Sequence, residues 1–227
     1  MTRATKAAAA LASLFPIRVV VEAEPPLRAS ELDLFGDPYP EERRYIEAAA
    51  DKRRAEFVTG RGCARRALAR LGVGPCAVPP GANRAPIWPA GIVGSISHTA
   101  DLCVAAVALS SDVASIGIDI EGAEPLGADL LPVVCTPREL AWLATLSDDE
   151  RGRWAKRLFG AKEAFFKCQF ARTQAMLDFQ DVEIDGSVTT NTLAARLLPP
   201  ALQGMDDMRG LWIEQGTHLL TAAWLPR

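Results

Sequence analysis

Segments typical of helices precede segments typical of strands in this chain, and this order occurs twice. Alanine-rich and charged stretches come first in each half, and short apolar stretches bounded by turn residues follow them. This order predicts an α+β fold with two pseudo-symmetric α/β lobes, each a small antiparallel sheet packed with helices. We divide the chain into an N-terminal lobe over 1–114 and a C-terminal lobe over 115–227. The expected helices span 7–15, 41–71, 136–146 and 148–170, and the expected strands span 17–22, 92–97, 102–109, 115–121, 182–184, 192–198, 211–215 and 219–225.

Short motifs mark the ends of several elements. Ser147 and Glu150 have the spacing of a capping box at the start of the last helix. Gly72 stands where the second helix should end. Two dipeptides with glycine in second place are expected as hairpin turns, namely Asp185-Gly186 and Gln215-Gly216.

Composition places the chain among ordinary globular proteins. Of its 227 residues, 49% are hydrophobic and 23% are charged, so it needs neither a metal nor disulfides simply to fold. The net charge of −3 argues against general nucleic-acid binding. The five cysteines are odd in number and include no C-x-x-C pair, which favours a reducing compartment over a disulfide framework or a structural zinc site.

The N-terminus and the hydropathy pattern bear on location. Arg3 and Lys6 precede the apolar run 7–15, as in a signal peptide, but the run is mostly alanine and is interrupted by Pro16 and Arg18. No other stretch approaches the roughly 20 apolar residues that a membrane-spanning helix needs. We therefore expect a cytoplasmic protein with no nucleic-acid and no membrane partner.

The segment 115–121 is an apolar strand that ends in an acid, a hydrophobe and an acid. Side chains two apart in a strand share a face, so Asp119 and Glu121 project together with their Cα atoms roughly 7 Å apart. Mg²⁺ is the cation that favours a few carboxylates plus water and substrate phosphates. For an isolated pair of this kind, a solvent-exposed strand end is the commoner explanation.

The segment 159–167 supplies a third carboxylate. Glu163 and Lys167 are four apart and so share one helix face, which by itself would suit a surface ion pair of about 0.2–0.5 kcal/mol. Three phenylalanines in the segment favour burial instead, and buried charges need partners. Glu163 would then be the third metal carboxylate, and Lys162 and Lys167 would face phosphates. We expect the active site at the interface of the two lobes.

The segment 94–99 offers hydroxyl and imidazole groups at a strand end. Ser97, His98 and Thr99 together suit a phosphate, although a lone histidine is more often structural and the two hydroxyls also suit a turn. A Ser-His nucleophile pair is disfavoured because adjacent strand residues face opposite ways.

Arginines concentrate in the second helix. Arg53 and Arg61 are eight apart and lie near one helix face, where guanidinium groups would clamp phosphate, although most arginines of this helix suit a solvated face. Asn83 and Arg84, in the loop after that helix, can join such a clamp.

Taken together, the ordered motifs R-A-P-I-W-P (84–89), G-S-I-S-H-T (94–99), G-I-D-I-E (117–121) and F-G-A-K-E-A-F-F-K (159–167) resemble the Sfp/EntD-type 4′-phosphopantetheinyl transferases. The Trp88-Pro89 pair and the short second half are similar to the EntD branch, which includes actinobacterial members. The resemblance implies two α/β lobes with coenzyme A as substrate and Mg²⁺, or Mn²⁺, in the cleft between them.

The resemblance also assigns roles to single residues. It implies metal ligation by Asp119, Glu121 and Glu163, and catalysis by Glu163, Lys167 and Asp119. The implied coenzyme A contacts are Arg53, Arg61, Gly81, Asn83, Arg84, Ser97, His98, Asp119, Lys162, Glu163, Lys167 and, next to the pantetheine arm, Leu177.

The implied reaction transfers 4′-phosphopantetheine from coenzyme A to a serine of an apo carrier protein and releases 3′,5′-ADP. Glu163, directly or through a metal-bound water, would take the proton, and Lys167 would stabilise the leaving phosphate. The carriers of fatty-acid, polyketide and nonribosomal-peptide synthases all qualify, and the family implies a monomer.

Three alternatives stay open on the sequence. They are a Mg²⁺-dependent phosphohydrolase using the same acids, a noncatalytic nucleotide- or DNA-binding module, and a family member that binds coenzyme A without transferring.

Overall fold

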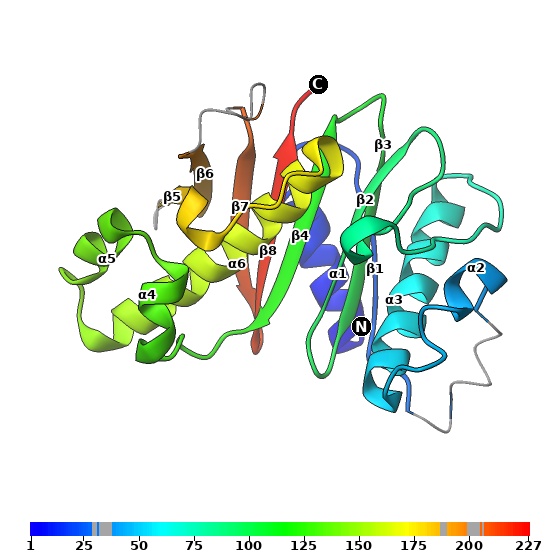
Figure 1. Ribbon diagram of the computed structural model, residues 1–227, viewed down its shortest axis with the longest axis horizontal. Helices are drawn as coiled ribbons and strands as arrows, with labels where there is room; N and C mark the ends of the chain where they lie inside the picture. The colour runs from blue at the N-terminus through cyan, green and yellow to red at the C-terminus, as the bar shows by residue number, and fades with distance from the viewer. Residues whose placement is uncertain (29–30, 32–37, 187–189, 199–204, 206) are drawn as a thin grey trace.

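The computed structural model describes residues 1–28, 31, 38–186, 190–198, 205 and 207–227 and contains two antiparallel sheets (Figure 1). Within these residues, no helix is long and apolar enough to cross a membrane. The first half contains α1 (Arg3–Ser13), β1 (Val20–Glu24), α2 (Pro40–Arg43), α3 (Asp51–Arg70), β2 (Ile92–His98) and β3 (Cys103–Leu109). The second half contains β4 (Ser115–Gly122), α4 (Leu131–Val134), α5 (Pro137–Leu143), α6 (Asp148–Thr173), β5 (Val182–Gly186), β6 (Thr192–Leu197), β7 (Arg209–Gln215) and β8 (His218–Leu225).

The predicted α+β class and the two-sheet architecture are confirmed. The first sheet has the strand order β1-β3-β2 and the second has β4-β8-β7-β6-β5. In each sheet the first strand precedes the long helix, α3 or α6, and pairs with the last strand of its half. This shared order is the basis of the pseudo-symmetry between the halves.

Several element boundaries differ from the sequence prediction. The helix expected over 41–71 is two helices, because the buried Glu42 accepts hydrogen bonds from Arg65 and from the Val78 N–H and so anchors α2 to the loop after α3. The first strand begins at Val20 rather than at residue 17.

The hairpin turn expected at Asp185-Gly186 is wrong. Both residues lie within β5, where they pair with Ala194 and Leu193 of β6. The turn expected at Gln215-Gly216 lies one residue further on, because Gln215 pairs with His218 and Gly216 takes a left-handed φ of 65°. The capping box of Ser147 and Glu150 is confirmed at the start of α6.

Helix α1 packs on one face of both sheets. Its buried residues share a core with alternate residues of β4 and β8, such as Ile118 and Ala222, and with residues of β1 and β3, such as Val21 and Ala106. The opposite faces are covered by α3 on the first sheet and by α6 on the second. Alternation in β4 therefore turns Ile118 and Ile120 toward α1 and leaves Asp119 facing α6.

The two sheets meet along β2 and β4, which lie side by side without a backbone hydrogen-bond ladder between them (Figure 1). The hydroxyls of Ser95 and Ser97 accept hydrogen bonds from the N–H groups of Ile118 and Ile120, at 3.1 and 3.3 Å. The repeated serine in the 94–99 motif thus joins the halves of the molecule.

A second contact joins the halves at the strand ends. Asp101, in the turn after β2, accepts a hydrogen bond from His218 of β8 at 2.9 Å and forms an ion pair with Arg3 of α1 at 2.8 Å. Thr99 donates to the same carboxylate at 2.8 Å, so the turn interpretation of Thr99 is confirmed. These contacts connect the turn after β2 with the start of β8 and with α1.

Candidate active site

A cavity of about 360 Å³ lies where the two sheets meet. Strand β2 contributes the end of the 94–99 motif, β4 contributes its two acids, and α6 contributes residues one turn apart. The lining residues are Ile96, Ser97, His98, Asp119, Glu121, Phe159, Glu163 and Lys167. Side chains from three separate sequence motifs, at 94–99, 117–121 and 159–167, therefore line one cavity between the halves.

Asp119 is the most buried acid of this cavity, at 4% exposure. Its Oδ1 accepts hydrogen bonds from Lys167 Nζ at 2.6 Å and from Ser97 Oγ at 2.9 Å. Its Oδ2 is buried and has no hydrogen-bond partner among the described residues. One oxygen is thus fixed by the interface between the sheets while the other has an unused acceptor.

Glu121 and Glu163 are half-buried beside Asp119. Burial, followed by the negative charge of Asp119, raises the pKa of Glu121, which forms an ion pair with Lys156 at 3.3 Å. Burial also raises the pKa of Glu163, with the charges of Asp119 and Glu121 acting in the same direction against Lys167. The fold therefore holds three carboxylates where each additional negative charge is unfavourable.

The donor set of this cavity suits a divalent cation. A hard cation prefers carboxylate oxygens, and this cavity has three carboxylates. Two of them have raised pKa values, and the third has a buried oxygen without a partner among the described residues. As the side chains stand, no group of three histidine, cysteine or carboxylate residues in the described ranges is arranged to hold a metal ion. Lys167 and Lys156 instead pair with Asp119 and Glu121.

His98 links the cavity to α3. Its Nε2 lies 3.0 Å from Arg53 Nη1 and 3.7 Å from the Glu56 carboxylate. Burial lowers the pKa of His98, which favours the neutral imidazole. Ser97 makes its hydrogen bonds with Asp119, Ile120 and Lys167 rather than with His98, which agrees with the exclusion of a Ser-His pair.

A second cavity of about 540 Å³ opens beside the first and shares Ile96, Glu163 and Lys167 with it. Asn83 and Arg84 line it, and both have left-handed φ angles, 53° and 65°. Gly81 does not line this cavity, but its N–H donates to the Ala85 carbonyl at 2.7 Å and closes the loop.

Two of the sequence motifs pack against each other in this second cavity. A Cβ on Gly94 would lie 2.6 Å from the Trp88 ring and 2.9 Å from the Ala106 carbonyl. Only glycine leaves room there for the indole, which explains why the motifs at 84–89 and 94–99 occur together.

A third cavity, also of about 540 Å³, lies on the other side of Glu163. Its wall includes Phe166, Met176, Leu177 and Phe179. Glu163 lines all three cavities, so the carboxylate stands at their junction.

Arg61 is buried beneath the loop that follows α3. Its Nε donates to the Val78 carbonyl at 2.7 Å, its guanidinium stacks 4.4 Å from the Phe57 ring, and burial lowers its pKa to about 10. These contacts support the loop, and the phosphate role of Arg61 stays a prediction.

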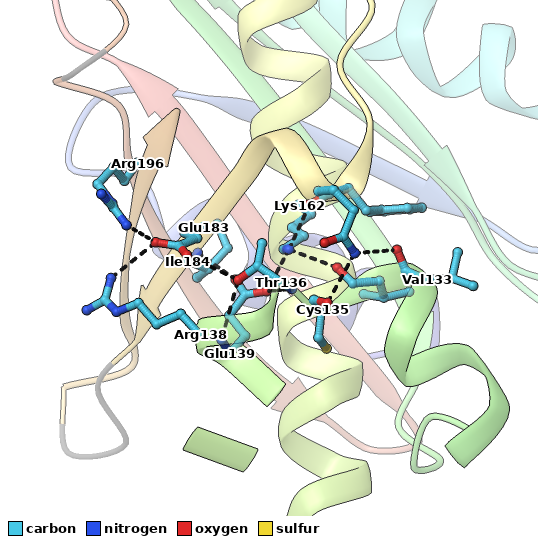
Figure 2. Close-up of polar contacts among 12 residues, drawn as sticks. Val133, Cys135, Thr136, Arg138, Glu139, Lys162, Glu183, Ile184 and Arg196 are labelled. Atoms are coloured by element: carbon cyan, nitrogen blue, oxygen red, sulfur yellow. Dashed lines mark hydrogen bonds and ion pairs between the residues drawn. The ribbon is translucent and has the colours of Figure 1, made fainter. Parts of the chain in front are cut away.

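The Lys162 amine is buried and fully hydrogen-bonded in this structure, and its expected contact with phosphate stays a prediction. Lys162 is 2% exposed, and Nζ donates to Glu139 at 2.7 Å, to the Val134 carbonyl at 2.8 Å and to the Phe179 carbonyl at 2.9 Å (Figure 2). An ammonium group has three N–H donors, and all three are used inside the C-terminal half.

Two charged residues of the site were missed by the sequence analysis. Lys156 pairs with Glu121, and its position seven residues before Glu163 places it on the same face of α6. Glu56, which is 8% exposed, contacts both Arg53 and His98. Helical spacing was the available signal for both, since each lies within two turns of a predicted site residue.

Comparisons with known proteins cover most of the chain. Residues 41–108 match the 4′-phosphopantetheinyl transferase N-terminal domain, and residues 115–204 match the 4′-phosphopantetheinyl transferase superfamily. The chain is 41% identical to 4′-phosphopantetheinyl transferase Svp of Streptomyces mobaraensis, over 81% of this chain and 77% of that protein.

Two other relatives are similar over comparable lengths. The chain is 36% identical to 4′-phosphopantetheinyl transferase PptT of Mycobacterium tuberculosis, over 84% of this chain and 89% of that protein. It is 30% identical to enterobactin synthase component D of Salmonella typhi, over 78% of this chain and 74% of that protein. The predicted resemblance to the EntD-type enzymes and their actinobacterial members is confirmed.

Proposed function

The chain belongs to the 4′-phosphopantetheinyl transferase family, and from this premise we propose how its own residues carry out the transfer. The enzyme moves the 4′-phosphopantetheine group of coenzyme A to a carrier protein. One observation supports the residue assignment, namely that side chains from β2, β4 and α6 line a single cavity between the sheets. Nothing in the comparisons supports the phosphohydrolase alternative.

We assign the divalent cation to Asp119, Glu121 and Glu163. The unpartnered Oδ2 of Asp119 and the mutually unfavourable charges of the three acids support this set. When bound, Mg²⁺ would neutralise charge on the coenzyme A pyrophosphate, and Mn²⁺ is the alternative ion. Lys167 and Lys156 would then be released from their pairs with Asp119 and Glu121 and be free to face phosphate.

Glu163 is our general base. The carrier serine oxygen forms a bond to the β-phosphorus of coenzyme A, the bond from that phosphorus to the bridging oxygen breaks, and 3′,5′-ADP leaves with the bond electrons. The serine proton passes to the Glu163 carboxylate. Glu163 lines all three cavities, so its carboxylate lies where both coenzyme A and the carrier serine can reach it.

The cationic groups of the site would stabilise the phosphates. Lys167 lines two of the three cavities and so can reach the leaving phosphate. Arg53 and the neutral His98, 3.0 Å apart at the mouth, would bind the 3′-phosphoadenosine end together with Asn83 and Arg84. Arg61 and Gly81 would hold the loop that carries these contacts, and Leu177 would border the pantetheine arm.

The remaining assignments concern the whole molecule. We propose that the lobes are divided at 114/115, which the two family matches over 41–108 and 115–204 support. Carriers of fatty-acid, polyketide or nonribosomal-peptide synthases are the proposed partners, and a monomer is the proposed active state. Size-exclusion chromatography with light scattering tests the monomer directly.

The assignment of the site is tested by carrier loading. Purified enzyme, coenzyme A, MgCl₂ and an apo carrier are incubated, and the carrier mass is measured. We expect Asp119→Ala and Glu163→Gln to abolish the gain of one phosphopantetheine, with Asp149→Asn, an exposed acid of the same helix, as the matched control. Loading near the wild-type rate by both site variants would refute the assignment, and release of 3′,5′-ADP without a carrier would favour the hydrolase.

A further inference from the structure

The ion pair between Lys162 and Glu139 is buried on both sides. Their side chains are 1% and 5% exposed, and Nζ lies 2.7 Å from Glu139 Oε2. A buried charge without its partner is strongly unfavourable, so each residue fixes the position of the other.

Glu139 uses both carboxylate oxygens. Besides Lys162, Oε2 accepts from the Thr136 N–H at 2.8 Å, which is the capping box of α5. Oε1 accepts from the Ile184 N–H of β5 at 2.8 Å. One carboxylate therefore ties α5, α6 and β5 together (Figure 2).

Lys162 uses its other two donors on backbone carbonyls of segments that are far apart in the sequence. Val134 is the last residue of α4, and Phe179 opens a short 3₁₀ turn, η4 (Phe179–Asp181). The segment 177–182 forms the wall of the third cavity opposite Glu163, which directly follows Lys162 in α6.

The pair belongs to a larger polar cluster that anchors β5. Glu183 accepts hydrogen bonds from Thr136 and Arg138, both at 3.3 Å, and pairs with Arg196 (Figure 2). Thr136 therefore connects the two buried glutamates, Glu139 and Glu183. The segment that leads into β5 is held at Phe179 by Lys162 and at Ile184 by Glu139.

We propose that Lys162 and Glu139 are a positioning pair that sets the distance between Glu163 and the 177–182 wall. The inference rests on the proposed function, in which this wall borders the pantetheine arm. Lys162 would act on the reaction through Phe179 and Glu139 and without touching phosphate. Because Glu139 lines none of the three cavities around Glu163, its variants separate this role from direct ligand binding.

The test compares two ligands and three variants. Lys162→Met, Glu139→Gln and the double variant are titrated calorimetrically with coenzyme A and with 3′,5′-ADP, which lacks the pantetheine arm. We expect each single variant to lose affinity for coenzyme A and to lower kcat by roughly tenfold to a hundredfold, the effect of a misplacement of about 1 Å. Affinity for 3′,5′-ADP should stay within about twofold of wild type.

The double variant keeps the test valid if a single variant does not fold, because it leaves no unpaired buried charge. We expect its losses to be no greater than those of the worse single variant, as for residues that act as one unit. The exposed pair on the same helix, Arg153 and Asp149, is the control, and Arg153→Met should change neither ligand's affinity.

Two results would overturn the proposal. One is a Lys162→Met variant that loses affinity while Glu139→Gln binds coenzyme A normally, which would make Lys162 a direct ligand contact. The other is a folded double variant with wild-type affinity for coenzyme A and wild-type kcat. Failure of the wild-type enzyme to load any carrier would count against the proposed function, while the comparison of the two ligands would still test the pair.

Discussion

Gly117 is the point at which β4 and α6 lie closest together. A Cβ at this position would be 2.0 Å from the Ala164 carbonyl oxygen and 2.6 Å from the Cys168 N–H. Both atoms belong to the α6 backbone, so no side-chain rotation can relieve the contact. Gly117→Ala should therefore push α6 away from β4.

The displacement can be worked from these distances. Ordinary contact begins at 3.4 Å, and 3.4 Å less 2.0 Å leaves about 1.4 Å for the helix to move. Glu163 and Lys167 directly precede the two residues in contact, so they move with the helix while Asp119 stays on β4. A misplacement of about 1 Å can cost about 100-fold in rate, and overpacking of this kind costs about 1–3 kcal/mol of stability.

Two measurements check the prediction. Carrier loading followed by mass spectrometry should be slower by about 100-fold. Thermal unfolding should show Tm lowered by roughly 2–12 °C, from the stability cost and the scaling for a chain of this length. Gly74→Ala is the control, because a Cβ there meets nothing within 4 Å. A Gly117→Ala enzyme with wild-type Tm and wild-type loading would show that the separation of β4 and α6 does not set the site geometry.

Three further outcomes are expected. Because the fold raises the pKa of Glu163, its ionised form is disfavoured, so Glu163→Gln should raise the Tm of the metal-free protein at pH 7. The gain in Tm should vanish below about pH 4, where the unfolded chain also protonates this group. A Tm of the variant below that of the wild type at pH 7 would contradict the charge argument. The hydrogen bond from His218 lowers the pKa of Asp101 to about 2, so this contact stabilises the fold above about pH 4 and is lost as the pH falls toward 2. Asp101→Asn should therefore make stability depend less on pH over this range, as followed by acid unfolding with circular dichroism. An acid-unfolding curve identical to that of the wild type would show that the contact does not contribute to the pH dependence. Arg53→Ala should raise the KM for coenzyme A by about tenfold with little change in kcat, because the variant loses one charge-assisted hydrogen bond to phosphate. An unchanged KM would show that Arg53 does not bind the phosphate.

Local geometry accounts for what could be predicted from the sequence. Asp119 and Glu121 line one cavity because strand residues two apart always share a face, and Glu163 and Lys167 do so because helix residues four apart lie one turn apart. The capping box at Ser147 was predictable for the same reason, since its partners lie within one turn.

Long-range packing decided the rest. Glu42 breaks the expected helix over 41–71 through contacts with the distant Arg65 and Val78. The serines of the 94–99 motif hold two sheets together, which no spacing within the motif could indicate.

Lys162 and Glu163 show most clearly which features the sequence determines and which only the tertiary structure decides. The sequence placed both on one helix, and successive helix residues point about 100° apart, so only one of them can face a given neighbour. Which one faces the cavity between the sheets depends on where α4, α5 and the 177–182 segment pack, and the residues that Lys162 contacts there lie up to 28 residues away in the chain. The sequence by itself determined that Asp119 shares a strand face with Glu121 and that Glu163 shares a helix face with Lys167, because both pairings follow from local periodicity. Only the tertiary structure decided that the Lys162 ammonium points inward, because its three partners are brought together by the fold.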